Sequence, residues 1–158
     1  GEEFGLLGAQ AWVKAHKDKL PKIANLFNRD GGPEPPVGIS VPQAMYDDFV
    51  KISEPIQKIR PDYPFEVKVR EPRKRPTRMG GTDASVFAIE GVPTLGFTTE
   101  DFKGYDFDYG EIWHTERDLY TKNIPEYQEH TATVTAIIAL GVANLDKQLS
   151  REGLYTEE

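Results

Sequence analysis

The sequence has 158 residues, a formal net charge of −7 and no cysteine. A chain of this length forms one domain with a buried core, and the lack of cysteine excludes disulfides and thiolate metal sites. The acidic balance argues against nucleic acid as the main partner. The longest apolar stretch, TVTAIIALGVANL, is too short to cross a bilayer.

The chain is predicted to open with a helix followed by a buried strand. Apolar residues recur at helical spacing over residues 6–18, and Pro21 is expected to end this helix because proline lacks the amide hydrogen that a helix interior needs. The apolar run KIANLFNRD is predicted as a buried strand over residues 22–30, whose last residue is the polar Asp30.

The middle of the chain is predicted to alternate strands and helices. The segment GGPEPPVG reads as a loop, since prolines and glycines exclude regular structure, and a brief strand at Ile39 and Val41 follows it. A helix over residues 42–59 has its apolar residues on one face, and Pro55 is expected to kink it or split it in two. PFEVKV alternates with a period of two, which indicates a half-buried strand.

The C-terminal half continues this pattern. REPRKRPTRMGGT is predicted as a basic loop, DASVFAIEG as a short helix that begins near Asp83, and VPTLGFT as another buried strand. TEDFKGYDFDYGEIWHTERD has no clear period and is predicted as a long loop, and residues 126–149 form the last helix. Strands that alternate with helices predict an α/β fold, in which helices flank a mixed, mainly parallel sheet.

Two adjacent carboxylates, Glu2 and Glu3, stand at the start of the chain. On a turn they can take two roles in one site, with one binding a metal and its neighbour acting as general base toward the metal-bound water. The alternative is a solvated helix N-terminus, where the helix dipole favours glutamate. The pair by itself favours this alternative.

Asp30 and His114 are the next candidates. Asp30 follows the predicted apolar strand, where functional groups gather in open α/β sheets, although an ordinary Asp-Gly turn explains it more simply. His114 lies in the segment WHTERD, with Asp118 close enough in sequence to orient its imidazole. His16 and His130 lie on predicted helices and are expected to be structural.

Two further segments have a functional and a plain interpretation. KVREPRKRPTR has six cations in eleven residues and suits an acidic partner or a polyanion, but its prolines and the acidic chain around it favour a solvated loop. GGTDASVF suits a turn that binds an anion at a helix N-terminus. Its plain interpretation is capping of the helix by Thr82 or Asp83.

Taken together, the segments EEFGLLGA, NRD, GGTDASVF, GVPTLGF and WHTERD resemble one family in order and in approximate spacing. They resemble the co-catalytic di-zinc aminopeptidases of metallopeptidase clan MH, a clan that also includes carboxypeptidase Q. The resemblance runs from Glu2 to the last helix, which is nearly the whole chain. Its most specific motif is the Glu-Glu pair followed by Gly-Leu-x-Gly-Ser/Ala, and the His-Thr pair before the final helix supports it.

The resemblance implies a role for each candidate residue. Glu2 matches the general base that takes a proton from the metal-bridging water. Glu3 and His114 match ligands of one zinc ion, and Asp30 matches a ligand of the other. Trp113 stands where several members carry a tyrosine that helps to polarise the tetrahedral intermediate, so that another donor is expected to stabilise the transition state.

The resemblance also implies an incomplete site. The family's upstream His-x-Asp segment, which supplies two further ligands, has no counterpart in this sequence. We therefore expect residues 1–158 to form the C-terminal part of one zinc-peptidase catalytic domain, and to bind zinc weakly and be inactive alone. The N-terminal part of the domain is an expected partner, and the sheet surface that it leaves uncovered is expected to permit self-association.

The implied function is that of a zinc-dependent exopeptidase acting on peptides, an aminopeptidase rather than a carboxypeptidase or dipeptidase because the family is mainly the former. The sequence begins at Gly1 rather than at methionine, which suggests a removed segment and an exported protein, periplasmic, secreted or at the cell surface. A glutaminyl cyclase-like acyltransferase with a single zinc is an enzymatic alternative, since it shares this fold. A catalytically degenerate binding domain is the non-enzymatic one, and the retention of all four site residues argues against it.

Overall fold

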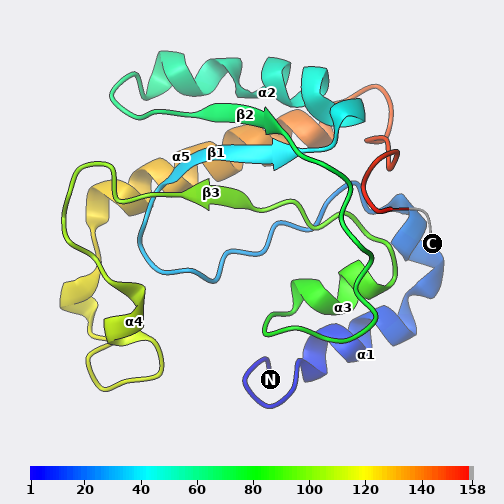
Figure 1. The fold of residues 1–158 in the computed structure, drawn as a ribbon, viewed down its shortest axis with the longest axis horizontal. Helices are drawn as coiled ribbons and strands as arrows, with labels where there is room; N and C mark the ends of the chain where they lie inside the picture. Colours follow the sequence, from blue (N-terminus) through cyan, green and yellow to red (C-terminus); the bar gives the residue numbers. More distant parts are fainter. Residues whose placement is uncertain (157–158) are drawn as a thin grey trace.

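The computed structural model describes residues 1–156 and has an α/β architecture, in which helices flank a small mixed sheet (Figure 1). This confirms the predicted fold class. Helices α2 and α5 pack on each other and against the sheet, whereas α1 and α3 pack on each other near the N-terminus. No helix within residues 1–156 is long and apolar enough to cross a membrane.

The elements in chain order are α1 (Leu7–Ala15), the 3₁₀ helix η1 (Lys17–Lys22), β1 (Pro36–Val41), η2 (Gln43–Met45), α2 (Tyr46–Ile59), β2 (Glu66–Val69), α3 (Ala84–Ile89), β3 (Phe97–Thr99), α4 (Tyr109–Ile112), η3 (Tyr120–Lys122) and α5 (Pro125–Ala143).

Strand β1 is the centre of the sheet, whose order is β2-β1-β3. It runs parallel to β2, with Ile39 opposite Val67, and antiparallel to β3. β1 begins at Pro36, inside the segment predicted as a loop, because proline is tolerated as the first residue of a strand. The two parallel strands approach closely at Gly38, where a Cβ atom would overlap the carbonyl oxygen of Glu66. Glycine is therefore required at this position.

Two clusters of buried apolar side chains hold the layers together. The larger lies between the sheet and helices α2 and α5 and includes Ile39, Val41, Phe49, Ile56, Val134 and Ile138. The smaller joins α1 to α3 and includes Leu6, Val13, Leu20, Val86, Phe87 and Val92. The apolar residues that recur at helical spacing in the sequence thus face these cores, since the burial of apolar area drives the packing.

The strand predicted over residues 22–30 is wrong. After η1 the chain is extended and lies beside residues 93–95, where the N–H of Leu26 donates to the carbonyl of Pro93 (2.9 Å). The side-chain amide of Asn25 bonds both the N–H and the C=O of Leu95 (2.8 and 3.2 Å). These side-chain bonds replace the backbone ladder of a strand pair, so an apolar run packs here without becoming a strand. For the same reason the predicted strand VPTLGFT shortens to β3.

Proline and helix ends also differ from the predictions. Pro21 lies inside η1, a 3₁₀ turn, so the α-helix has already ended at Ala15. Pro55 lies inside α2, which runs unbroken over its range because its apolar face is buried, so the proline does not split the helix. Helix α5 ends at Ala143 rather than at residue 149, and the N–H of Asn144 caps it by donating to the carbonyl of Leu140 (3.0 Å).

Two histidines have structural surroundings, as predicted. His130 is fully buried, with Nε2 3.0 Å from the carbonyl oxygen of Pro36 and its ring stacked on Tyr63 at 3.9 Å. Burial lowers the pKa of His130, because it disfavours the charged imidazolium. His16 places Nδ1 2.9 Å from the carbonyl oxygen of Trp12 and stacks on that indole ring.

Candidate functional site

The N-terminal carboxylates lie on a turn and not on a helix. The carbonyl of Glu2 accepts hydrogen bonds from the N–H groups of Gly5 (3.0 Å) and Leu6 (2.9 Å). Gly5 and Leu6 both have positive φ, 107° and 59°, and α1 begins only at the next residue. Glycine adopts this backbone without strain, which explains its place in the turn. Glu2 and Glu3 therefore project from a tight turn, which is the geometry that lets neighbouring side chains take different roles.

Glu3 meets His114 across the molecule. The Oε1 atom of Glu3 lies 3.0 Å from Nε2 of His114, although the two residues are 111 positions apart. Their side chains are 67% and 54% exposed. His114 has a φ of 56°, a left-handed conformation that is costly for a residue other than glycine and that concentrates at functional sites. The indole ring of Trp113 lies beside the imidazole, with ring centroids 4.5 Å apart.

Asp30 lies on an exposed turn that contacts on two sides hold in place. The guanidinium of Arg29 donates to the carbonyl of Gly32 (2.6 Å), and the hydroxyl of Tyr109 donates to the carbonyl of Asp30 (3.4 Å). Gly32 has a φ of +72°, and a Cβ atom there would lie 3.0 Å from the rings of Phe107 and Tyr109. Helix α4 thus touches the Asp30 turn at its start and leads to His114 at its end.

The carboxylates of this region act on one another. The pKa of Glu2 is raised, first by partial burial and then by the negative charges of Glu3, Asp30 and Asp83. The charges of two other segments, at Asp30 and Asp83, therefore act on Glu2 together with that of its neighbour Glu3. The Oδ1 atom of Asp83 is shielded from solvent and has no hydrogen-bond partner within residues 1–156.

The donor chemistry of these side chains fits zinc. Imidazole nitrogen and carboxylate oxygen are usual zinc donors, and the contact between Glu3 and His114 provides one of each. No group of three or more histidine, aspartate or glutamate side chains in the described part of the chain is close enough to hold a metal ion. Residues 1–156 therefore bring together a pair of donors, with Glu2 and Asp30 within electrostatic reach, and not a full ligand set.

Sequence reasoning missed three residues that shape this site. Tyr109 and Arg29 hold the Asp30 turn; Tyr109 lies in a segment without a period, and Arg29 stands in the NRD segment, of which only Asp30 was singled out. Asp83 is the third. It was named only as a possible cap of the next helix, and not as a residue whose charge acts on the site. Asp83 makes no side-chain cap of α3, and instead Ser85 donates its hydroxyl to the carbonyl of Thr82 (2.7 Å), so the capping interpretation is wrong.

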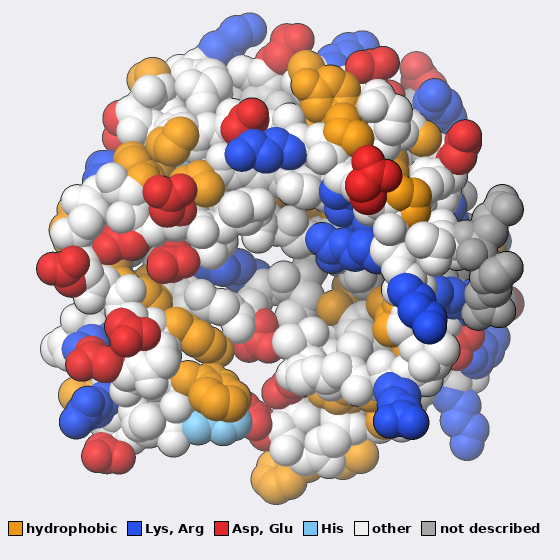
Figure 2. Space-filling view, in the orientation of Figure 1, with side chains coloured by type: hydrophobic (Ala, Val, Ile, Leu, Met, Phe, Trp, Pro, Cys, Tyr) orange, Lys and Arg blue, Asp and Glu red, His pale blue; other side chains and the backbone are white. Residues whose placement is uncertain are grey.

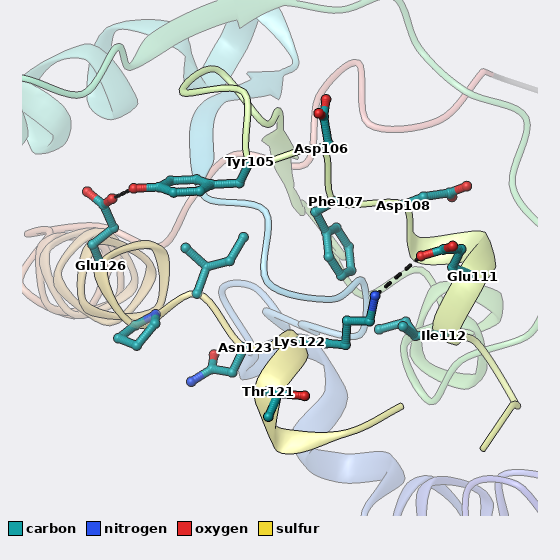
Figure 3. A pocket seen from close by; sticks show the side chains of 12 residues that line it. Tyr105, Asp106, Phe107, Asp108, Glu111, Ile112, Thr121, Lys122, Asn123 and Glu126 are labelled. Atoms are coloured by element: carbon teal, nitrogen blue, oxygen red, sulfur yellow. Dashed lines mark hydrogen bonds and ion pairs between the residues drawn. The ribbon is translucent and has the colours of Figure 1, made fainter. Parts of the chain in front are cut away.

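Two cavities adjoin the site. One, of about 730 Å³, is lined by the Asp30 turn, Tyr109 and the segment 118–123. The other, of about 510 Å³, lies between residues 105–112 and 121–126 (Figure 3). Ile112 and Lys122 line both, so the cavities are neighbours. Figure 2 shows this face hollowed at its centre, with acidic side chains and a histidine below the hollow.

One wall of the second cavity is fixed by a polar cluster. Tyr105 and Lys103 both donate to the carboxylate of Glu126, with the Nζ of Lys103 2.5 Å from Oε2. Figure 3 shows Tyr105 and Glu126 pointing toward each other across the top of the cavity. These bonds, that from Lys103 first, lower the pKa of Glu126 to about 2. The carboxylate therefore stays ionised, and its hydrogen bonds hold this wall of the cavity in place.

The structure brings one carboxylate, that of Glu3, against the imidazole of His114 from a distant loop, and these are donor types that metal-dependent hydrolases use. The sequence profile of Peptidase family M28 matches residues 1–138. The chain belongs to this peptidase family, whose members are generally zinc-dependent hydrolases. The predicted resemblance to metallopeptidase clan MH is thereby confirmed, because family M28 is part of that clan.

A solved structure supports the fold. The chain is similar to a Peptidase M28 precursor from Shewanella amazonensis, with a TM-score of 0.68 and 24% sequence identity. The match covers 95% of this chain and 31% of the solved chain, so the chain spans about a third of that relative's length. A search of curated proteins found no significant match.

Proposed function

We propose that this chain is the C-terminal part of the catalytic domain of an exported zinc-dependent aminopeptidase. The observation that carries the proposal is the contact between Glu3 and His114 beside Glu2, in a chain of a peptidase family. Export is proposed because the solved relative is described as a precursor. The peptide substrate and the remaining part of the domain are the proposed partners.

Each side chain has a proposed task. Glu3 and His114 bind one zinc ion, and Asp30 contributes to a second, with ligands from outside this chain completing both. When bound, zinc supplies a Lewis acid that polarises the scissile carbonyl and lowers the pKa of its water. Glu2 accepts the proton of the attacking water as general base, a role that a carboxylate next to a metal ligand can take.

The choice of an aminopeptidase rests on charge. Asp83, whose charge acts on Glu2, takes no part in the proposed zinc binding, and its shielded Oδ1 is an acceptor without a donor within residues 1–156. A free peptide amino terminus carries a positive charge and hydrogen-bond donors, which suit this carboxylate. A free carboxyl terminus would be repelled by it.

Zinc binding tests the ligand assignment. Isothermal titration of the 158-residue chain is expected to show weak zinc binding. Glu3→Gln and His114→Asn are each expected to weaken it at least about tenfold, since each removes a ligand. Asparagine tolerates the left-handed backbone of residue 114. Glu54→Gln, on the exposed surface of α2, is the matched control. Two tight zinc sites on this chain would contradict the proposal of an incomplete ligand set.

Activity tests the reaction. The assay uses the longest natural polypeptide that contains this chain, with leucine p-nitroanilide, its N-acetylated form and an N-blocked peptide with a free carboxyl end. The proposal predicts hydrolysis of the first alone. Glu2→Gln should lower kcat by about 10²–10⁴-fold and leave zinc affinity unchanged. Cleavage of the N-blocked peptide in preference to leucine p-nitroanilide would overturn the aminopeptidase assignment.

The outer strands of the sheet are the proposed contact surface for the rest of the domain. β2 and β3 flank β1 in the described sheet, and Val69 of β2 is 46% exposed. Uncovered strand edges associate with other chains. Size-exclusion chromatography of the 158-residue chain is expected to show self-association, and a monomer at all concentrations would argue against this surface.

A further inference from the structure

A cluster of arginines lies apart from the candidate metal ligands, at the C-terminal end of α3. Arg73 forms an isolated backbone bridge with Tyr155, and Arg70 donates to the carbonyl of the preceding residue, Leu154. Arg75 and Arg151 donate to the carbonyls of Ile89 and Gly91 at the end of the helix. Tyr155 itself donates to the carbonyl of Ala88, in the last turn of α3 (3.3 Å). Within residues 1–156, none of these arginines forms an ion pair with a carboxylate.

Three of these arginines are held in place by neutral groups. Arg70 donates to the carbonyl of Leu154 (3.5 Å), and Arg75 donates to that of Ile89 (2.9 Å through Nε). Arg151 donates to the carbonyls of Leu20 (3.0 Å) and Gly91 (3.1 Å). A carbonyl oxygen satisfies an N–H group but does not cancel the positive charge, so the charge of the cluster remains. The pKa of Arg70 is lowered by burial and then by the nearby charge of Arg73, as expected for crowded cations.

The remaining cations of the cluster lie on the loop between β2 and α3, and their side chains are exposed. Arg73, Lys74 and Arg78 extend into solvent, and none of them has an ion-pair partner among the residues that the structure describes. The backbone beneath them is fixed, because the N–H of Thr156 donates to the carbonyl of Arg73 (2.9 Å). Charged side chains on a fixed backbone lose less conformational entropy when they bind a partner.

These cations form a strip that leads toward the candidate site. Arg75 is anchored at the C-terminal end of α3, whereas a Cβ atom on Gly80 would touch Ser85 at its start (3.4 Å). The loop therefore runs back along α3 and ends at Asp83, whose charge acts on Glu2. Figure 1 shows the loop after β2 descending to α3 beside the N-terminal turn, and Figure 2 shows lysine and arginine side chains gathered over it.

We propose that this basic strip, formed by Arg70, Arg73, Lys74, Arg75, Arg78 and Arg151, binds acidic segments of peptides. The planar guanidinium group matches a carboxylate in shape and can donate two parallel hydrogen bonds to it. A short acidic peptide fits a strip of this kind, whereas a long polyanion such as nucleic acid would extend onto the rest of a chain whose net charge is −7. The binding itself does not depend on the proposed catalysis.

Fluorescence anisotropy with a labelled peptide of six glutamates tests the strip on the 158-residue chain. The peptide is expected to bind with an affinity that falls as salt rises, because exposed ion pairs are screened. Arg73→Glu with Arg78→Glu should weaken binding at least about tenfold, since both residues are exposed and their side chains donate no hydrogen bond to the part of the chain that the structure describes. Lys51→Glu with Lys58→Glu, on the exposed face of α2, makes the same change of charge elsewhere and should change the affinity less than about twofold.

Circular dichroism confirms that each variant is folded. Glu157 and Glu158 follow Thr156 in the sequence, and replacing both with glutamine should leave the affinity unchanged or raise it. Three results would each overturn the proposal: equal loss in the two charge-reversal pairs, equal binding of a six-glutamine peptide, or tighter binding of a single-stranded oligonucleotide with the same number of charges.

Discussion

The region around β1 and the region around Glu3 are built in opposite ways. Ile39 and Val41 on β1 are at most 1% exposed, and α2 and α5 cover them with apolar side chains. Glu3 and His114 are more than half exposed and lie on loops. The non-glycine residues with positive φ in the described chain are Leu6, Asp106 and His114, all outside the sheet and its covering helices. The sheet and its covering helices thus have relaxed backbone, while the strained non-glycine residues lie in loops, two of them in the segments that hold Glu2, Glu3 and His114.

The largest expected loss of stability comes from a substitution in the sheet. Gly38→Ala places a methyl group against the carbonyl of Glu66 in the parallel strand pair, and should lower the free energy of unfolding by about 2–3 kcal/mol. Gly8→Ala is the matched control, because nothing lies within 4 Å of a Cβ atom there and alanine favours the helix. Urea denaturation measures both. Equal effects of the two substitutions would contradict this account of the strand pair.

A substitution in the loops should cost less. Gly32→Ala forces alanine into a φ of +72° and against the rings of Phe107 and Tyr109, with an expected loss of about 1–2 kcal/mol. Gly81→Ala is the control, since nothing lies within 4 Å of a Cβ atom there and its φ lies outside the left-handed region. Thermal unfolding compares them. If the control is as unstable as Gly32→Ala, the packing of α4 on the Asp30 turn is not what fixes this glycine.

The pH dependence of stability reports on the core. The pKa of His130 is lowered in the folded state, mainly by burial, so the unfolded chain binds the proton more readily. This contribution is present above the unfolded pKa of about 6.5 and is lost as pH falls toward the folded value. The free energy of unfolding should therefore fall between pH 7 and 5, by at most about 1.4 kcal/mol per pH unit from this group. Urea denaturation of His130→Gln should show a flatter dependence, and an unchanged slope would exclude His130 as its source.

The smallest effect on stability is expected at the site itself. Glu3→Gln and His114→Asn remove an exposed contact and should change the free energy of unfolding by less than about 0.5 kcal/mol, although both are expected to weaken zinc binding. Urea denaturation without metal makes the measurement. A loss of unfolding free energy similar to that of Gly38→Ala would show that the contact supports the fold, and would contradict the difference between the two regions.

The sequence predicted the regular parts of this fold well because their signal is local. The apolar face of α2 and the alternation of β2 are visible in the residues themselves. The segment 22–30 was misassigned because strand formation depends on a partner, and there Asn25 supplies side-chain bonds in place of a ladder. The start of β1 at Pro36 was missed for a related reason, since a proline-rich segment becomes a strand only when a neighbouring strand pairs with it, as β3 does here.

For the site, the motifs singled out Glu2, Glu3, Asp30 and His114, and the structure places Glu3 against His114 and the charge of Asp30 near Glu2. The roles of these residues stay predictions until zinc binding and activity are measured. The support from Tyr109 could not be predicted, because it depends on how a loop without periodicity packs against a turn far away in the chain.

The contact between Glu3 and His114 has a thermodynamic consequence. It joins residues 111 positions apart, so it closes a loop of most of the chain. A ligand held by both side chains is a reversible cross-link, which restricts the unfolded chain as a long disulfide loop does. Such a ligand binds the folded chain only, and each tenfold rise in its free concentration above the dissociation constant adds about 1.4 kcal/mol to stability. The molecule's resistance to unfolding is therefore also a gauge of how much of that ligand its surroundings contain.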